Sequence, residues 1–305
     1  MCAKGTPPGR LTPKAWLALA VTLLLWSSAY AGIRAGLHSF NPGQLAVLRF
    51  LVASAVLGIY AWLAHFRRPL ARDLPGLTLA GAIGISFYML ALNYGEVRVP
   101  AGAASLIVAS TPIWTALIAR FMLQERLRPL AWIGVMISFV GVAALAASES
   151  GGIRLSAHAL VVLAAAIASG TYIVLQKHFL SRYSALEISA YTIWPGTLLM
   201  LPFANGLITA MKGAPLTTTL VVVYLGVFPG AIAYVTYAYV LRHGSAGSSA
   251  SFLYLTPVLA ILIAWIWLGE RPRALSLLGG GLALAGVVLV NASNRLASSE
   301  VASEG

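Results

Sequence analysis

The stretch TPVLAILIAWIWLGERPR, residues 256–273, begins with a proline in an apolar run and ends with charged residues and a second proline. A stretch of the same design, TPIWTALIARFMLQERLR, occupies residues 111–128, 145 positions earlier. When residues 101–145 are aligned without gaps to residues 246–290, 15 of the 45 positions are identical. Self-similarity at a fixed spacing indicates an internal repeat. The chain is therefore predicted to contain two related halves.

The composition places both halves in a membrane. Hydrophobic residues make up 59% of the 305 residues and charged residues only 9%, whereas soluble domains carry about 25% charge. Apolar segments recur near the ~20 residues that a helix needs to span a bilayer, and runs such as LALAVTLLLW lack the alternation of a membrane β-barrel. We therefore predict an all-α polytopic membrane protein with ten transmembrane helices. The expected spans are 14–35, 43–65, 74–94, 100–122, 129–147, 157–177, 186–207, 217–240, 247–268 and 274–292.

These spans divide the chain into two repeats of five. The first repeat is predicted within residues 1–150, the second within 151–292, and a disordered cytoplasmic tail in 293–305, where the sequence is polar. Because five is odd, the second repeat is expected to be inverted in the bilayer relative to the first. Inverted repeats are typical of carriers that work by alternating access around a central cavity.

The distribution of positive charge predicts the orientation. The net charge is +12, but no basic run is longer than two residues, which favours a topology signal over nucleic-acid binding. With the N-terminus inside, 13 Lys and Arg side chains fall on inner segments and 6 on outer ones. Both termini are therefore expected in the cytoplasm. The alternative is a signal peptide cleaved after Ala29-Tyr30-Ala31, which would leave nine spans.

Matched prolines and charged pairs mark the fourth span of each repeat. Pro112 and Pro257 lie inside expected spans, where proline removes a backbone hydrogen bond and kinks the helix. We interpret them as a hinge or a cavity lining, with a static packing kink as the alternative. Glu125-Arg126 and Glu270-Arg271 follow in the turns, where each glutamate can complement a helix N-terminus.

The chain resembles the drug/metabolite transporter superfamily, specifically its ten-span EamA-type exporters. LLWSSAYAGIRAGL resembles the first span of that family, and NPGQLAVLRFLVAS resembles the second, with Pro42 and Arg49 in the expected places. Spans three to five are resembled by ALNYGEVRVPAGAASLIVASTPIWTALIARFMLQERLRPLAWIGVMISFVGVAAL. Trp26-Ser27 stands where the family usually has Trp-Gly. The nearest branch is that of the YddG-like amino-acid exporters. This resemblance implies export of amino acids or other small metabolites across the bacterial inner membrane.

One cation and several aromatic residues are the candidate substrate-binding groups. Arg49 is expected about seven residues inside its span, roughly 10 Å deep; it can hold a substrate carboxylate or pin neighbouring carbonyls. Tyrosine and tryptophan near mid-span suit a cavity for solutes with an apolar part and a polar end. The predicted lining residues are Trp26, Tyr30, Arg49, Tyr88, Tyr172 and Tyr234, with Gln176 and Asn93 as weaker candidates.

The acidic residues are expected only in connections, in the tail or at span edges. Carriers that couple to protons commonly use carboxylates within the membrane. The hypothesis is therefore facilitated export down a solute gradient, or coupling through an edge group such as Glu187 or His178.

Enzymatic functions find no support in the motifs. There is no Walker-type glycine loop, no metal-ligand spacing among the histidines and only one cysteine, Cys2. No cofactor or metal is expected. The favoured function is a secondary exporter of amino acids or related metabolites. Its rival within transport is a multidrug efflux carrier for amphiphilic or cationic compounds. Outside transport, the rivals are a lipid-modifying membrane enzyme and a scaffold. The expected partners are a small-molecule substrate and the lipid bilayer, with no nucleic acid, and the expected state is a monomer.

Overall fold

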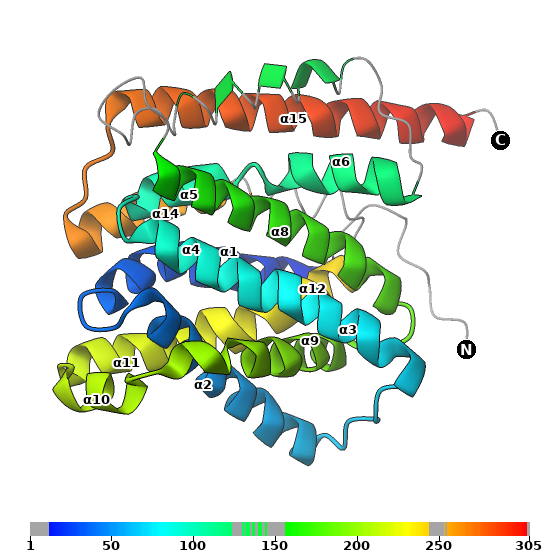
Figure 1. Ribbon diagram of the computed structural model, residues 1–305. Coiled ribbons are helices and arrows are strands. Elements are labelled where there is room, and N and C mark those ends of the chain that lie inside the picture. Colours follow the sequence, from blue (N-terminus) through cyan, green and yellow to red (C-terminus); the bar gives the residue numbers. More distant parts are fainter. Residues whose placement is uncertain are drawn as a thin grey trace.

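A computed structural model shows a bundle of helices that run alongside one another (Figure 1). It describes residues 12–123, 156–243, 253 and 255–303, with separate positions between 130 and 144. Within these residues every regular element is a helix. The first half comprises α1 (Pro13–Gly36), α2 (Pro42–Leu63), η1 (Ala71–Asp73), α3 (Leu74–Gly81), η2 (Ala82–Phe87), α4 (Tyr88–Glu96), α5 (Ala101–Val108) and α6 (Thr111–Leu123). The second comprises α8 (Ala157–Phe179), α9 (Ala185–Met200), η3 (Leu201–Ala204), α10 (Leu207–Gly213), α11 (Leu216–Leu225), η4 (Gly226–Ile232), α12 (Ala233–His243), α14 (Leu255–Leu268) and α15 (Ala274–Ser303).

Five helical segments are long and apolar enough to cross a membrane. A sixth is obtained if Ala185–Ala204 and Leu207–Gly213, which meet at 78°, count as one span. The chain is therefore a multi-pass membrane protein, whereas ten crossings stay a prediction. The expected fifth span, 129–147, lies mostly outside the described residues. The long segments are Pro13–Gly36, Pro42–Leu63, Ala71–Glu96, Ala157–Phe179 and Leu216–Arg242, and shorter apolar helices are Ala101–Thr115, Leu255–Leu268 and Leu277–Gly286.

Local structure repeats in the two halves. The second long helix of each half begins with a capping box: Asn41 with Gln44 on α2, and Ser184 with Glu187 on α9. In such a box the two side chains satisfy backbone N–H groups that the first helical turn leaves free. The third long segment of each half contains a π-helical turn, η2 in one and η4 in the other. The predicted repeat thus has counterparts in the backbone.

The two halves interleave instead of forming separate lobes. Helix α1 packs on α12 and α14 of the second half, and α8 packs on α4 and α6 of the first. Helix α2 packs on η4, and α9 packs on η2. One continuous apolar core therefore contains side chains from both halves, among them Ile33, Leu45, Ile85, Ile188 and Ile193.

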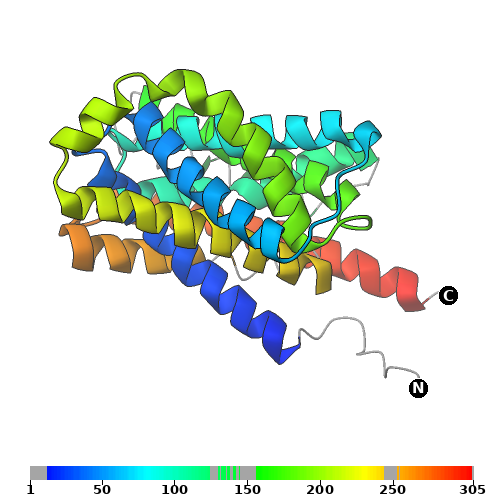
Figure 2. The same cartoon turned by 90° about the horizontal axis from the view of Figure 1, so that it is seen from below.

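The bundle has two distinct ends. The start of α1 and the end of α15 lie on the same side, at the right in Figures 1 and 2. The last turn of α1 and the end of α4 meet at the opposite end, where Arg34 contacts the Glu96 carbonyl. We call this the Glu96 end, and the other, where Asp73 begins the third segment, the Asp73 end. Large apolar side chains such as Trp62, Ile208 and Ile266 are exposed on the outside, as lipid contact requires.

Two features differ from the sequence-based expectations. The span expected over 100–122 is interrupted at Ala109 and Ser110, between α5 and α6, so Pro112 is the second residue of α6, and its role as a hinge or kink stays a prediction. Proline suits that position because the first turn of a helix leaves its N–H groups unbonded. Helix α15 continues to Ser303, so most of the tail expected to be disordered is helical. Alanine, leucine and glutamate, with no glycine or proline before Gly305, favour that continuation.

Candidate functional site

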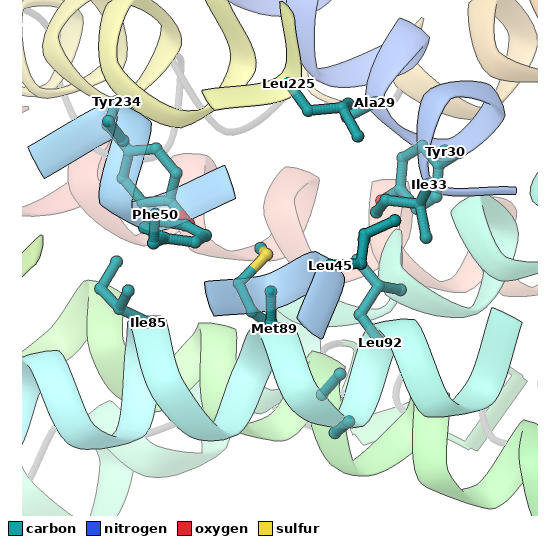
Figure 3. Close-up of a cluster of buried hydrophobic side chains, with 14 of the residues drawn as sticks. Ala29, Tyr30, Ile33, Leu45, Phe50, Ile85, Met89, Leu92, Leu225 and Tyr234 are labelled. Atoms are coloured by element: carbon teal, nitrogen blue, oxygen red, sulfur yellow. The ribbon is translucent and has the colours of Figure 1, made fainter. Parts of the chain in front are cut away.

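The six predicted lining residues converge in the middle of the bundle. They come from α1, α2, α4, α8 and α12, and therefore from both halves. Tyr30, Arg49, Tyr172 and Tyr234 are buried, and Trp26 and Tyr88 are partly buried. Figure 3 shows Tyr30 and Tyr234 on either side of Met89, with Phe50 beneath Tyr234.

Tyr234 is the centre of an aromatic cluster. Its ring centroid lies 5.6 Å from that of Trp26 and 6.4 Å from that of Tyr172, both in edge-to-face geometry. Phe50, which the sequence analysis did not select, lies 6.3 Å from Tyr234. Edge-to-face pairs of this kind are favourable because the positive ring edge meets the negative face. We call Trp26, Phe50, Tyr172 and Tyr234 the aromatic cluster.

Arg49 lies beside this cluster and ties the two halves together. Its side chain is only 2% exposed, its Nε donates to the Leu225 carbonyl at 3.2 Å, and its Nη1 lies 3.4 Å from the Met89 sulfur. The guanidinium carbon is 5.4 Å from the Phe50 ring centroid. Leu225 is the last residue of α11, next to the π-turn η4, so one guanidinium N–H of Arg49 is used in a hydrogen bond to the main chain there. A buried arginine needs such acceptors.

Tyr30 and Tyr88 form a second group near Arg49. The two hydroxyls lie near each other and near Arg49 and Glu96, whose charges act on both of them. The structure thus brings all six predicted residues together, as the aromatic cluster with Arg49 and as the Tyr30–Tyr88 pair.

Glu96 is the residue that the sequence analysis missed. It ends α4, as expected of a span edge, but its side chain is 0% exposed and neither carboxylate oxygen has a hydrogen-bond partner. By contrast, Asp73, Glu187 and Glu270 in the described part of the chain all accept hydrogen bonds. The sequence gives no signal for the burial of Glu96, because the groups that enclose it come from distant helices.

A group of polar contacts closes the Glu96 end. Arg34 Nε pairs with Glu270 Oε1 at 3.1 Å, and Arg34 Nη1 donates to the Glu96 carbonyl at 2.6 Å. The Ala101 N–H, at the start of α5, donates to Glu270 Oε2 at 2.9 Å. Glu270 therefore does stabilise a helix N-terminus, but that of a helix in the other half. We call Arg34, Glu270 and the Ala101 N–H the outer clasp, because the orientation predicted from the positive charges places the Glu96 end outside. Glu125 and Arg126 lie outside the described residues.

A second group of contacts closes the Asp73 end. Arg182 Nη1 donates to Asp73 Oδ1 at 2.6 Å, and the Tyr183 hydroxyl donates to Asp73 Oδ2 at 2.7 Å. Burial and the bond to Asp73 raise the pKa of the Tyr183 hydroxyl, which keeps it a donor. Glu187 accepts from the Ser184 and Arg67 N–H groups. Both ends of the bundle are thus held by contacts between the two halves.

The remaining candidates are Pro257, Gln176 and Asn93, and none of them has a ring contact with the aromatic cluster. Pro257 is the third residue of α14 and is buried. Gln176 and Asn93 are buried, and the Asn93 Nδ2 donates to the Pro42 carbonyl at 3.0 Å. The oxygens Gln176 Oε1 and Asn93 Oδ1 have no partner.

The family comparison matches the chain twice. Residues 13–147 and 156–292 each match the EamA-like transporter family. The two matches correspond to the two halves and cover nearly all of the chain.

Curated relatives and a solved structure agree with that match. The chain is 41% identical over 282 residues to a probable terminal-alkyne amino-acid exporter of Streptantibioticus cattleyicolor, covering 92% of this chain and 94% of the relative. It is 40% identical to the uncharacterized transporter YdfC of Bacillus subtilis, covering 89% and 90%, and 30% identical to the uncharacterized inner membrane transporter YedA of Escherichia coli K12, covering 90% and 89%. A solved structure with 22% sequence identity superposes with a TM-score of 0.63 over 92% of this chain and 98% of that one, which supports the fold alone.

Proposed function

Because this chain belongs to the EamA-like transporter family, we propose that it exports amino acids or related small metabolites by alternating access between two inverted five-helix repeats. The family and its relatives are transporters, not enzymes. Its apolar spans and its bacterial relatives, one of them an inner membrane transporter, support a multi-pass protein of the inner membrane. We further propose that the chain crosses the membrane ten times and that both of its termini are cytoplasmic.

Exchanged contacts between the halves support the inverted arrangement. Where α1 packs on α14, the corresponding helix α8 packs on α6; where α2 packs on η4, α9 packs on η2. The same exchange holds for single residues. A Cβ on Gly81 would lie 2.3 Å from the Thr192 carbonyl, and one on Gly226 would lie 2.5 Å from the Arg49 carbonyl. Such reciprocity is expected of a two-fold relation between the repeats, and with five spans in each that relation inverts one of them.

The observation that carries the proposed function is the convergence on Tyr234. This side chain of the second half contacts Trp26 and Phe50 of the first half and Tyr172 of its own. Substrate sites of such carriers lie between the repeats, near the middle of the bilayer. Rings with hydroxyl and indole groups suit a solute with an apolar side chain, and Arg49 suits its carboxylate.

The relative from Streptantibioticus cattleyicolor narrows the substrate class. That relative is a probable exporter of terminal-alkyne amino acids, which carry a carboxylate and an apolar end. In the proposed cycle the outer clasp and the Asp73 contacts open in turn. The aromatic cluster then faces one side of the membrane at a time.

Counterflow in liposomes tests this function. Purified protein is reconstituted into vesicles loaded with an unlabelled amino acid, and entry of the same labelled compound is followed. We expect labelled aliphatic and alkyne-bearing amino acids to accumulate transiently, and Tyr234→Ala to reduce the initial rate at least tenfold. Accumulation of cationic drugs but of no amino acid in the panel would replace amino-acid export with multidrug efflux.

A further inference from the structure

We propose that Glu96 is the proton-coupling carboxyl of this transporter, taking up a proton at the Glu96 end and releasing it on the other side as solute leaves. This inference rests on the proposed export function and adds its driving force. It starts from one observation: the Glu96 side chain is fully buried and both of its oxygens lack a partner.

Unlike Glu96, the carboxylates of Glu187 and Asp73 are hydrogen-bonded through both oxygens. Glu187, an edge group considered for coupling, has one oxygen on the Ser184 N–H and the other on the Arg67 N–H. Asp73 is held by Arg182 and Tyr183. A buried carboxylate without donors is costly unless a cation or a proton reaches it. Intramembrane carboxyls of carriers commonly relay protons for that reason.

Glu96 also lies where proton binding can act on transport. Arg34, one residue of the outer clasp, donates to the Glu96 carbonyl while its Nε pairs with Glu270. Arg34 therefore bonds the main chain of Glu96 and the carboxylate of Glu270, and it makes no hydrogen bond to the Glu96 carboxylate. Met89, which contacts Arg49, is seven residues before Glu96 on the same segment, about two turns or roughly 10 Å away. Helix α4 therefore contacts Arg49, beside the aromatic cluster, through Met89 and contacts the clasp residue Arg34 through the Glu96 carbonyl.

The charged and titratable groups around Glu96 come from every packed element except α5, whose residues Ala101–Val108 contain none. Arg34, Arg49 and Glu270 act on its charge, and Tyr30 and Tyr88 interact with it. On α8, the His158 carbonyl would lie 3.0 Å from a Cβ on Gly95, so His158 begins the facing part of that helix. The facing groups are Arg34 and Tyr30 from α1, Arg49 from α2, Tyr88 from its own segment, His158 from α8, and Glu270 after α14.

The step conserves protons and leaves the protein unchanged after one cycle. With the outer clasp open, water outside gives one proton to a Glu96 oxygen, and the neutral carboxyl permits the clasp to close. With the Asp73 contacts open, the proton passes to water inside, and the carboxylate is restored. One solute molecule moves outward in the same cycle, so a proton gradient directed inward drives export.

Two measurements on the full chain test the proposal. In vesicles that contain a pH-sensitive dye, an imposed solute gradient is expected to move protons with the wild-type protein. Glu96→Gln is expected to abolish this movement and to keep counterflow within about twofold, because exchange returns the carrier without a proton cycle. The matched control is Glu187→Gln, which keeps the capping box of α9 because glutamine at the third helical position can also bond the N-cap N–H. This variant should retain both proton movement and counterflow.

The outcomes separate the two proposals. Absence of amino-acid counterflow in the wild type contradicts the proposed export function, and infrared spectroscopy then tests Glu96 without any solute. The carbonyl band of a protonated carboxyl is expected near neutral pH in the purified wild type and should be missing in Glu96→Gln. Loss of counterflow together with proton movement, at an unchanged Tm, would assign Glu96 to solute binding and overturn the inference. So would proton movement at the wild-type rate in Glu96→Gln, or an infrared band common to both proteins.

Discussion

Ser54 on α2 and Thr197 on α9 share a hydrogen bond of 2.8 Å between their side-chain oxygens, and they are 143 positions apart. That separation equals the one between the helix caps Asn41 and Ser184. Helices α2 and α9 therefore cross at equivalent positions, as two copies related by an approximate two-fold axis do. The finding links the internal repeat of the sequence to a contact between the two halves.

The first prediction concerns this pair. Ser54→Ala and Thr197→Ala should each lower the free energy of unfolding, and the double variant should lose less than the sum. The expected coupling is about 0.6 kcal/mol, the usual value for polar pairs between membrane helices. A double-mutant cycle of unfolding in detergent measures it. Thr197 Oγ1 also bonds the Ile193 carbonyl, so strictly additive effects would show that this local bond carries the stability.

The second prediction concerns the close approach of α3 and α9. A Cβ on Gly81 would lie 2.3 Å from the Thr192 carbonyl, which cannot move without moving α9. Gly81→Ala should therefore destabilise the protein by about 1–3 kcal/mol, seen as a lower Tm. The matched control is Gly58→Ala on α2, where nothing lies within 4 Å of the added carbon. Equal Tm changes in the two variants would argue against the backbone contact.

The third prediction concerns Arg49. Arg49→Met removes the donor to the Leu225 carbonyl and the charge proposed to hold a solute carboxylate. We expect at least a tenfold loss in counterflow of amino acids and a smaller loss for the corresponding amines, which lack the carboxylate. Arg49→Lys keeps the charge without the fork of donors and should raise KM more than it lowers the maximal rate. An equal loss for amino acids and amines would leave Arg49 with a purely structural role.

The fourth prediction concerns the outer clasp. Glu270→Gln weakens the pair with Arg34, so the Glu96 end should open more often. Cys2 is the single cysteine, so Cys2→Ser with Ala103→Cys provides one reporter, at a site that is 5% exposed beneath the clasp. We expect maleimide labelling of this reporter to become severalfold faster with Glu270→Gln. Unchanged labelling, with Lys212→Gln as the control substitution, would mean that the ion pair does not restrain this end.

The fifth prediction concerns topology. Ten spans with a cytoplasmic N-terminus place Arg34 and Glu96 at the outer face and both chain ends inside. Reporter fusions after Gly305 should be active as cytoplasmic enzymes, and fusions in the loop before Pro42 should be active as periplasmic ones. A periplasmic C-terminus combined with a cytoplasmic N-terminus would exclude an even number of crossings.

The sequence predicts the starts of the long helices well because their signals are local. Asn41 with Gln44 and Ser184 with Glu187 are capping pairs that can be read from spacing alone, and α2 and α9 begin within a residue of the predicted spans. The break before Pro112 is harder to predict, because proline is equally compatible with a bend and with the start of a helix.

The candidate site was only partly predictable for a different reason. Trp26 and Tyr234 could be selected as aromatic residues near mid-span, and they do lie together. The burial of Glu96 could not be predicted, because it depends on Arg34, Tyr30 and Glu270, which are distant from Glu96 in the sequence. Local patterns indicate which residues lie in the membrane, but not which distant groups enclose a side chain at its edge.

The glycines of α3 and α9 have a consequence for how parts of the molecule can shift. A Cβ on Gly196 would lie 2.8 Å from the Gly81 carbonyl, so the two helices touch main chain to main chain. Because backbone contacts leave little room for sliding at that crossing, we expect α3 and α9 to shift together in any rearrangement. Because α3 belongs to the first repeat and α9 to the second, we expect such a shift to join parts of both repeats instead of moving one repeat against the other.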